Sequence, residues 1–296
     1  MTERIALGVE YDGRGFCGWQ TQPAGCSVQD ALQAALSRMA GHGITVTCAG
    51  RTDAGVHASW QVLHFDTDAR RPESAWTRGV NAFLPPAVSV LWARQVGPAF
   101  HARFDARSRS YRYRLLCRAA RPAIDHGRVG WWPGALDLGA MREAAGLLLG
   151  THDFSTFRAA ECQARTPVRE LQLVDIGIAD GVISFDLRAN AFLHHMVRNI
   201  VGSLVYVGAG RRPPRWIGDI LAARDRSLAA PTFAPDGLSL RGVEYDPTHG
   251  LPEPPPVGGG GLSSGNLPCV PGSRSAESPA PRTPSPPPPP APTRSA

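Results

Sequence analysis

The chain has 296 residues, with 31 basic residues, all of them arginine, against 25 acidic ones, so its net charge at pH 7 is +6. With 43% hydrophobic residues it can build one large or two modest cores, and its six cysteines show neither CxxC pairs nor the framework of a small secreted scaffold. No apolar run reaches membrane length and no apolar targeting segment opens the chain, so we expect a cytoplasmic protein without structural zinc. The arginine excess favours a nucleic acid partner, although a biased genome would produce the same composition.

The first part of the chain opens with a strand and then a helix. Ile5, Leu7 and Val9 alternate as in a half-buried strand, and Ser27 precedes an Ala- and Leu-rich run with helical spacing that continues to Met39. The patterns that follow predict strands at Ile44 to Cys48, Gln61 to Phe65, Val88 to Val96 and Ser108 to Leu116, with a short helix at Ser74 to Asn81.

The second part begins with an amphipathic helix from the N-cap Asp137 to Leu149, which Gly150 is expected to end. A hairpin is predicted around Asp180-Gly181, the strongest short turn signal in the chain. Its strands are expected at Leu171 to Ile178 and Val182 to Leu187, followed by helices at Phe192 to Val207 and Trp216 to Ala223 and a last strand at Leu238 to Tyr245.

These patterns predict an α+β fold with mainly antiparallel sheets. We expect an N-terminal domain at residues 1–116, a C-terminal domain at 117–247, and a Pro/Gly/Ser-rich tail at 248–296 that is disordered because almost nothing in it is apolar. A proline-rich docking ligand is the alternative role for this tail.

The segment from Gly50 to Ala58 is the strongest candidate for chemistry. Apolar alternation stops at Cys48 and resumes near Trp60, so the segment is expected to be a loop between two strands, with Asp53 between glycines and two residues after Arg51. An aspartate there also forms local turns, which is the structural alternative. His57 follows at a spacing that suits a metal pair, but no further His, Asp or Glu completes a metal site, and we expect none.

Two other elements offer partners for a substrate. Arg198 lies on a nearly all-apolar predicted helix, where a guanidinium must either extend to water or be paired, with Asp53 or with a structural acid as its partner. Tyr111 and Tyr113 share one face of a strand with Arg107 and Arg109, so this face is predicted to stack a base or else to be strand core.

The loop from Gly50 to Ala58 resembles the signature of the tRNA pseudouridine synthase A family. Further blocks of that family are matched in order, over about Ile5 to Tyr245: Glu10-Tyr11-Asp12-Gly13, Gly18-Trp19-Gln20, Phe100-His101-Ala102-Arg103-Phe104, Tyr111-Arg112-Tyr113-Arg114 and His195-Met196-Val197-Arg198-Asn199-Ile200-Val201-Gly202. The resemblance implies two similar α/β-sandwich-like domains that meet at a central cleft. It also implies a cofactor-free homodimer that converts uridine to pseudouridine at positions 38, 39 and 40 of the tRNA anticodon stem-loop.

The resemblance assigns Asp53 as the catalytic carboxylate. It implies that Tyr111 and Arg51 bind the target nucleotide, and that Tyr113 is structural. It also implies that Arg198 pairs with Asp53 and that Leu238 lies near the pocket. Two residues depart from the family pattern: Ser110 stands where a basic residue is usual, with Arg109 as a candidate to compensate, and Ser239 replaces an aromatic residue.

Two other classes of function remain open at this stage. A non-catalytic RNA-binding protein or RNA chaperone would use the arginines and tyrosines without needing Asp53. A metal-dependent nuclease would need a divalent ion and would shorten its RNA, whereas an isomerase does neither.

Overall fold

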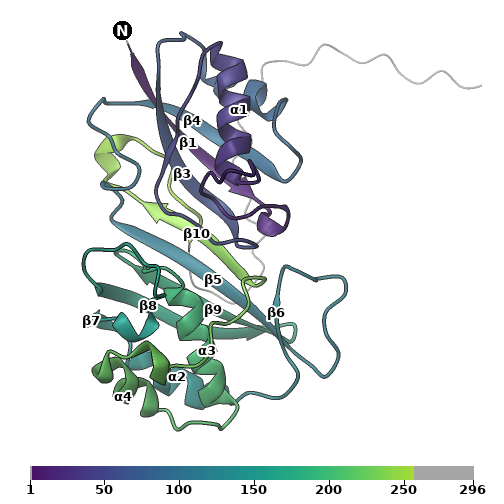
Figure 1. The fold of residues 1–296 in the computed structure, drawn as a ribbon, viewed down its shortest axis with the longest axis vertical. Helices are drawn as coiled ribbons and strands as arrows, with labels where there is room; N and C mark the ends of the chain where they lie inside the picture. Colours follow the sequence, from purple (N-terminus) through teal and green to yellow (C-terminus); the bar gives the residue numbers. More distant parts are fainter. Residues whose placement is uncertain (1, 257–296) are drawn as a thin grey trace, which may run out of the picture. The chain divides into compact units, whose positions relative to one another are not determined.

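Ten strands join into one mixed sheet in the computed structural model, which describes residues 2–256 (Figure 1). The strand order is β4-β1-β3-β10-β5-β9-β8-β7, with β2 added beside β3 and β6 beside β5. Pairing is antiparallel except between β10 and β3 and between β5 and β6. The predicted α+β class with mainly antiparallel pairing is confirmed, but the strands form a single continuous sheet.

One end of the sheet is built from the first part of the chain. It contains β1 (Glu3–Tyr11), β3 (His57–Thr67) and β4 (Val88–Val96), and α1 (Val28–Ala40) lies against these strands (Figure 1). The helix begins directly after Ser27, as predicted, and Ser27 caps it: its hydroxyl accepts from the backbone of Asp30 while the Asp30 carboxylate accepts from the backbone of Ser27.

The other end is built around the predicted hairpin. β8 (Val168–Ala179) and β9 (Val182–Ala189) pair antiparallel around Asp180 and Gly181, whose φ angles of 50° and 75° are those that a tight hairpin turn needs. The helices at this end are α2 (Leu138–Gly146), α3 (Met196–Gly208) and α4 (Trp216–Ala223).

The two ends are joined through the middle of the sheet by β5 (Ser108–Cys117) and β10 (Leu238–Glu244). β10 pairs with both β5 and β3, so the last strand of the chain connects its first part with its second. The division into domains at 116/117 stays a prediction, and this boundary falls at the end of β5.

The remaining elements are short. They are β2 (Thr47–Cys48), β6 (Gly130–Trp132), β7 (Gly150–Asp153), a π-helical turn η2 (Ala75–Gly79) and the 3-10 turns η1 (Gly13–Gly15), η3 (Ser155–Phe157), η4 (Arg226–Leu228) and η5 (Pro247–His249).

Three predicted boundaries are wrong. The strand expected from Ile44 is reduced to β2, and α2 ends before Gly150, which instead opens β7 with φ of 97°. The helix expected from Phe192 begins only at Met196, because His195 has left-handed backbone angles that a helix cannot contain.

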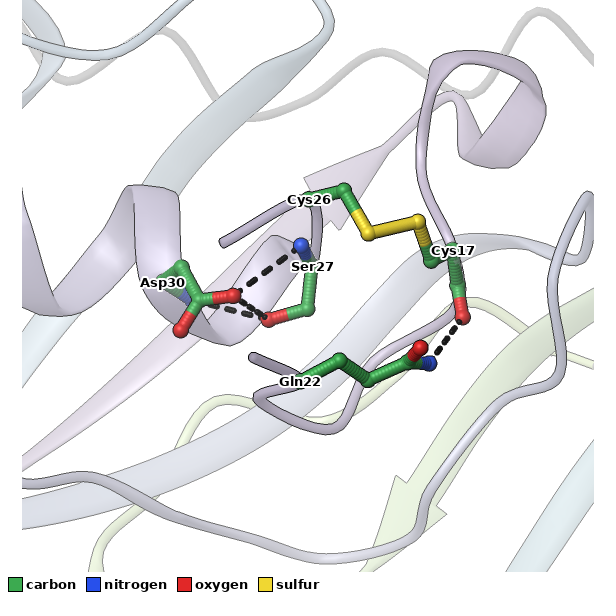
Figure 2. The surroundings of a disulfide bond; sticks show 5 residues. All are labelled: Cys17, Gln22, Cys26, Ser27 and Asp30. Carbon is green, nitrogen blue, oxygen red and sulfur yellow. Dashed lines mark hydrogen bonds between the residues drawn. A yellow bond between two sulfur atoms is a disulfide. The ribbon is translucent and has the colours of Figure 1, made fainter. Parts of the chain in front are cut away.

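A disulfide joins Cys17 and Cys26 in the loop before α1, with Cα atoms 5.5 Å apart (Figure 2). The same loop is held by a hydrogen bond from the Gln22 amide to the Cys17 carbonyl at 2.9 Å. This disulfide was not predicted, because the spacing of the two cysteines matches no established motif.

The tail predicted at 248–296 is described only as far as residue 256. Leu251 packs against the core. Pro254 lies against Gly242, where an added Cβ atom would be only 2.9 Å from Pro254 Cβ. The predicted disorder of 257–296 lies outside the described residues. Within the part that is described, no helix is long and apolar enough to cross a membrane.

Candidate active site

Asp53 lies at the first position of a tight turn between β2 and β3. The turn is closed by a hydrogen bond from the Val56 amide to the Asp53 carbonyl at 3.1 Å, and Gly55 supplies the positive φ of 78° that it requires. About a fifth of the Asp53 side-chain surface, 20%, remains open to solvent. The carboxylate is therefore held in place and is still reachable.

The loop is fixed from behind by buried contacts. The Thr52 hydroxyl pairs with the Tyr11 hydroxyl at 2.8 Å, and the Thr52 carbonyl accepts from the Trp19 amide at 2.9 Å. A Cβ added to Gly13 would lie 2.1 Å from the Val56 carbonyl oxygen, so only glycine allows this close approach. These contacts explain why residues near the start of the chain belong to the site.

Arg198 pairs with Asp53, as predicted. Its Nη1 lies 2.9 Å from Asp53 Oδ2, its Nε donates to the Phe233 carbonyl at 2.8 Å, and only 14% of its side chain is exposed. A guanidinium held at two points and shielded from water keeps its charge beside the carboxylate without being free to move.

Two histidines that the prediction did not include complete the surroundings of Asp53. His194 Nε2 lies 3.2 Å from Asp53 Oδ1, and His195 Nε2 lies 3.4 Å from Oδ2. Burial is the main cause that lowers the pKa of His195, partly offset by the Asp53 charge. The sequence signal was present, since His195 opens the block that contains Arg198 and His194 directly precedes it, but the expected helix start at Phe192 placed both on a helix.

Tyr111 is buried next to this group on β5. Its ring packs edge to face on the Phe192 ring, with centroids 5.1 Å apart. A Cβ atom added to Gly50 would lie 4.0 Å from the Tyr111 hydroxyl oxygen. Burial, and secondarily the negative charge of Asp53, raises the pKa of Tyr111 well above its ordinary value. The phenol therefore stays protonated and can donate a hydrogen bond, but it is not a base.

The neighbouring residues of β5 are structural. Tyr113 is fully buried and donates to the Ala234 carbonyl at 2.9 Å, which confirms its expected role. Arg109, a candidate to compensate for Ser110 on the face predicted to stack a base, is buried and donates to four backbone carbonyls, those of Ala49, Arg103, Ala106 and Asn190. This prediction is wrong, because the side chain is buried and four of its five N–H groups are taken up by backbone carbonyls, which leaves it out of reach of RNA.

The other predicted site residues lie on the Asp53 loop and on β10. Arg51 is exposed on the Asp53 loop. Leu238 is buried at the start of β10, where it pairs with Tyr113 rather than with Tyr111. Ser239 pairs with Arg112 and lines a hollow of about 720 Å³ on the opposite face of the sheet, so this departure from the family pattern does not touch Asp53.

His57 is turned away from Asp53. Its Nδ1 lies 3.3 Å from Asp12 Oδ1 and its Nε2 lies 2.8 Å from the Gly127 carbonyl oxygen. Among residues 2–256, the groups whose geometry would suit a metal ion are instead Asp53, His194 and His195, with ligand atoms within 4.8 Å of one another. Arg198 already occupies one oxygen of this carboxylate, and its charge opposes a cation at the same place.

Comparison with known proteins identifies the family to which the chain belongs. A family model described as tRNA pseudouridine synthase matches residues 8–105 and 144–246, which contain Asp53, Arg198, both histidines and most of the sheet. The gap between the two matched segments includes Tyr111.

Individual relatives match over nearly their whole length. A protein of Chromobacterium violaceum named tRNA pseudouridine synthase A is 62% identical over 84% of this chain and 95% of its own. Proteins of the same name from Methylobacillus flagellatus and Bordetella parapertussis are 57% and 56% identical over 84% of this chain, and over 95% and 93% of their own. The chain belongs to the tRNA pseudouridine synthase family, and its relatives are the synthases designated A.

Proposed function

We propose that this protein isomerises uridine to pseudouridine at positions 38, 39 and 40 of the tRNA anticodon stem-loop, with Asp53 as the nucleophile and no cofactor. The observation that carries the proposal is the partly exposed Asp53 carboxylate, held at 2.9 Å by a shielded Arg198 on a loop fixed by buried contacts. Family membership and relatives at 56–62% identity support the same reaction.

The reaction breaks the bond between N1 and C1′, turns the uracil over, and joins C5 to C1′. A carboxylate is suited to it because it forms a covalent intermediate and then leaves again. Asp53 acts either at C6 of the base or at the ribose. In both routes Arg198 orients the carboxylate before reaction and stabilises it when it is released.

Tyr111, Arg51 and Leu238 are proposed to hold the flipped nucleotide. The Tyr111 ring, whose hydroxyl keeps its proton, packs on the uracil and donates to it. The exposed Arg51 contacts the phosphate or helps to turn the nucleotide out of the stem. Leu238 acts indirectly, by packing beside Tyr113 below the pocket.

The partner is tRNA, and the protein works as a cytoplasmic homodimer that needs no metal. The net charge of +6 supports attraction to the phosphate backbone. Action at three adjacent positions indicates recognition by shape and backbone rather than by base sequence.

The proposal is tested with unmodified tRNA transcripts and a chelator. Wild type and Asp53→Asn are incubated with the tRNA, and pseudouridine is mapped by carbodiimide labelling and primer extension. Wild type is expected to modify the anticodon arm and Asp53→Asn to leave it unmodified. Modification elsewhere in the tRNA, shortened RNA, or equal activity of both proteins would refute the proposal.

A further inference from the structure

The proposed function leaves two imidazoles at the site without a role. His194 and His195 approach the two oxygens of the Asp53 carboxylate at 3.2 and 3.4 Å, one to each oxygen. Their rings lie against each other, with centroids 4.0 Å apart. Together with Arg198 they surround Asp53 with nitrogen atoms.

The backbone is strained at this point. His195 has φ of 61°, one of only three non-glycine residues with positive φ among those the structure describes. A residue other than glycine, asparagine or aspartate costs free energy there, and such strain gathers at functional sites. This conformation directs His195 toward Asp53 while the helix starts immediately after it.

His194 is fixed by its own backbone. Its carbonyl accepts from the Ala159 amide at 3.0 Å, and its amide donates to Cys162 Sγ at 3.4 Å. Its side chain is the more open of the two, with 41% exposed against 26% for His195. A substrate that reaches Asp53 therefore meets the His194 ring before the His195 ring.

The isomerisation moves one proton within the base. The N1–C1′ bond breaks and the C5–C1′ bond forms, C5 loses its proton, and N1 gains one, so that no proton is taken up or released overall. A group that accepts a proton from C5 and returns one to N1 must lie beside the carboxylate and exist in both protonation states near neutral pH.

The other groups around Asp53 do not meet this requirement. Arg198 cannot give up its proton. Tyr111 keeps its proton because burial and, secondarily, the Asp53 charge raise its pKa. Asp53 carries the covalent bond to the substrate and, once released, pairs again with Arg198. Imidazole is the side chain whose ordinary titration range fits the task.

We propose that His194 is the proton carrier of this site, accepting the proton from C5 and delivering one to N1, and that His195 is a positioning residue that holds Asp53 and the His194 ring. This inference rests on the proposed function. Formation of the covalent intermediate removes the negative charge that holds His194, and the imidazole is then free to turn toward the base.

The test measures single-turnover rates with tRNA whose uridines carry either hydrogen or deuterium at C5. We expect His194→Gln to slow turnover by about 10²-fold or more, with tRNA affinity within twofold of wild type and a C5 isotope effect larger than that of wild type. Added imidazole should restore part of the rate of His194→Ala. His195→Asn, which tolerates the left-handed backbone, should lower the rate without raising the isotope effect.

A matched control is His152→Gln, because the imidazole of His152 lies in another part of the fold, 2.7 Å from the Leu149 carbonyl oxygen and edge to face with the Phe154 ring. Its rate and isotope effect should equal those of wild type. An unchanged rate or an unchanged isotope effect in His194→Gln overturns the inference. If Asp53→Asn is inactive while His194→Gln is normal, only this inference fails; if Asp53→Asn is active, the proposed function fails with it.

Discussion

Arg198 Nη1 and Asp53 Oδ2 lie 2.9 Å apart although 145 positions separate the two residues in the chain. The sheet makes this contact possible, because β10 joins β3 at the end of the Asp53 loop to β5, and β5 leads to the half of the fold that contains α3. The guanidinium is fixed from its other side by the Phe233 carbonyl, which lies on the segment leading into β10.

Replacing Arg198 tests whether this contact acts in the reaction. We expect Arg198→Lys to lower the single-turnover rate by about 10²–10³-fold, because an ammonium cannot hold Asp53 and the Phe233 carbonyl in the same geometry. The measurement is pseudouridine formation at saturating tRNA.

Arg112→Lys is the matched control, since Arg112 also forms a shielded pair, with Asp186 at 2.7 Å, but on the opposite face of the sheet. It should keep nearly the wild-type rate. Equal losses in the two variants would show that any weakened ion pair lowers activity and would contradict a special role for Arg198.

The two tyrosines of β5 should separate substrate chemistry from stability. Tyr113→Phe loses a buried hydrogen bond to the Ala234 carbonyl and should reduce the free energy of unfolding by about 1 kcal/mol while the turnover rate is kept. Tyr111→Ala should reduce turnover severely and tRNA binding slightly, because the ring that packs on the base is gone. The measurements are urea unfolding and single-turnover rates on the same samples. Lost turnover in Tyr113→Phe together with normal turnover in Tyr111→Ala would contradict the assignment.

Acid should destabilise the fold partly through His64. Burial, and secondarily the charge of Arg4, lowers the pKa of His64 to about 4, against about 6.5 in an unfolded chain. Above pH 6.5 the imidazole is neutral in both states. As the pH falls from 6.5 to 4 the unfolded state takes up the proton first, so stability is lost in this window, by about 3.4 kcal/mol at most.

The control for this effect is His64→Asn, which does not titrate and has an amide oxygen that can accept the hydrogen bond from the Ala102 amide now made to His64. Its stability should depend less on pH between 6.5 and 4 in urea unfolding. Parallel pH profiles for the two proteins would rule His64 out as the cause.

The disulfide should contribute to stability and not to catalysis. It closes a loop between residues nine apart, so Cys17→Ser/Cys26→Ser should lower the free energy of unfolding by about 2–3 kcal/mol at most, and a reductant should lower that of wild type similarly. Turnover should persist in both cases, as the proposed cytoplasmic location requires. Cys117→Ser, at a free cysteine, is the control; loss of turnover on reduction would tie the loop to the reaction.

Regular elements could be predicted from the sequence because their signals are local. The turn chemistry of Asp180-Gly181 and the capping box at Ser27 each depend on a few neighbouring residues, and the structure contains both. An arginine on an apolar helix indicates a paired or water-reaching guanidinium, but that Asp53 is the partner of Arg198 followed only from the resemblance to the family block.

What could not be predicted depends on contacts far apart in the chain. The left-handed backbone of His195 is imposed by the packing around it, and the propensity of the residues nearby favours continuing the helix toward Phe192. The role of Arg109 likewise depends on four carbonyls from separate segments, which no spacing in the sequence reveals.

The central claim is that the Asp53 carboxylate performs the chemistry, and the most direct measurement is the single-turnover rate of Asp53→Asn at a tRNA concentration that saturates binding. Asparagine keeps the size of the side chain and removes its charge, so tRNA affinity should stay near that of wild type while no pseudouridine forms. An Asp53→Asn protein that binds tRNA normally and makes pseudouridine within about tenfold of the wild-type rate, a difference of about 1.4 kcal/mol in activation free energy, would contradict this account.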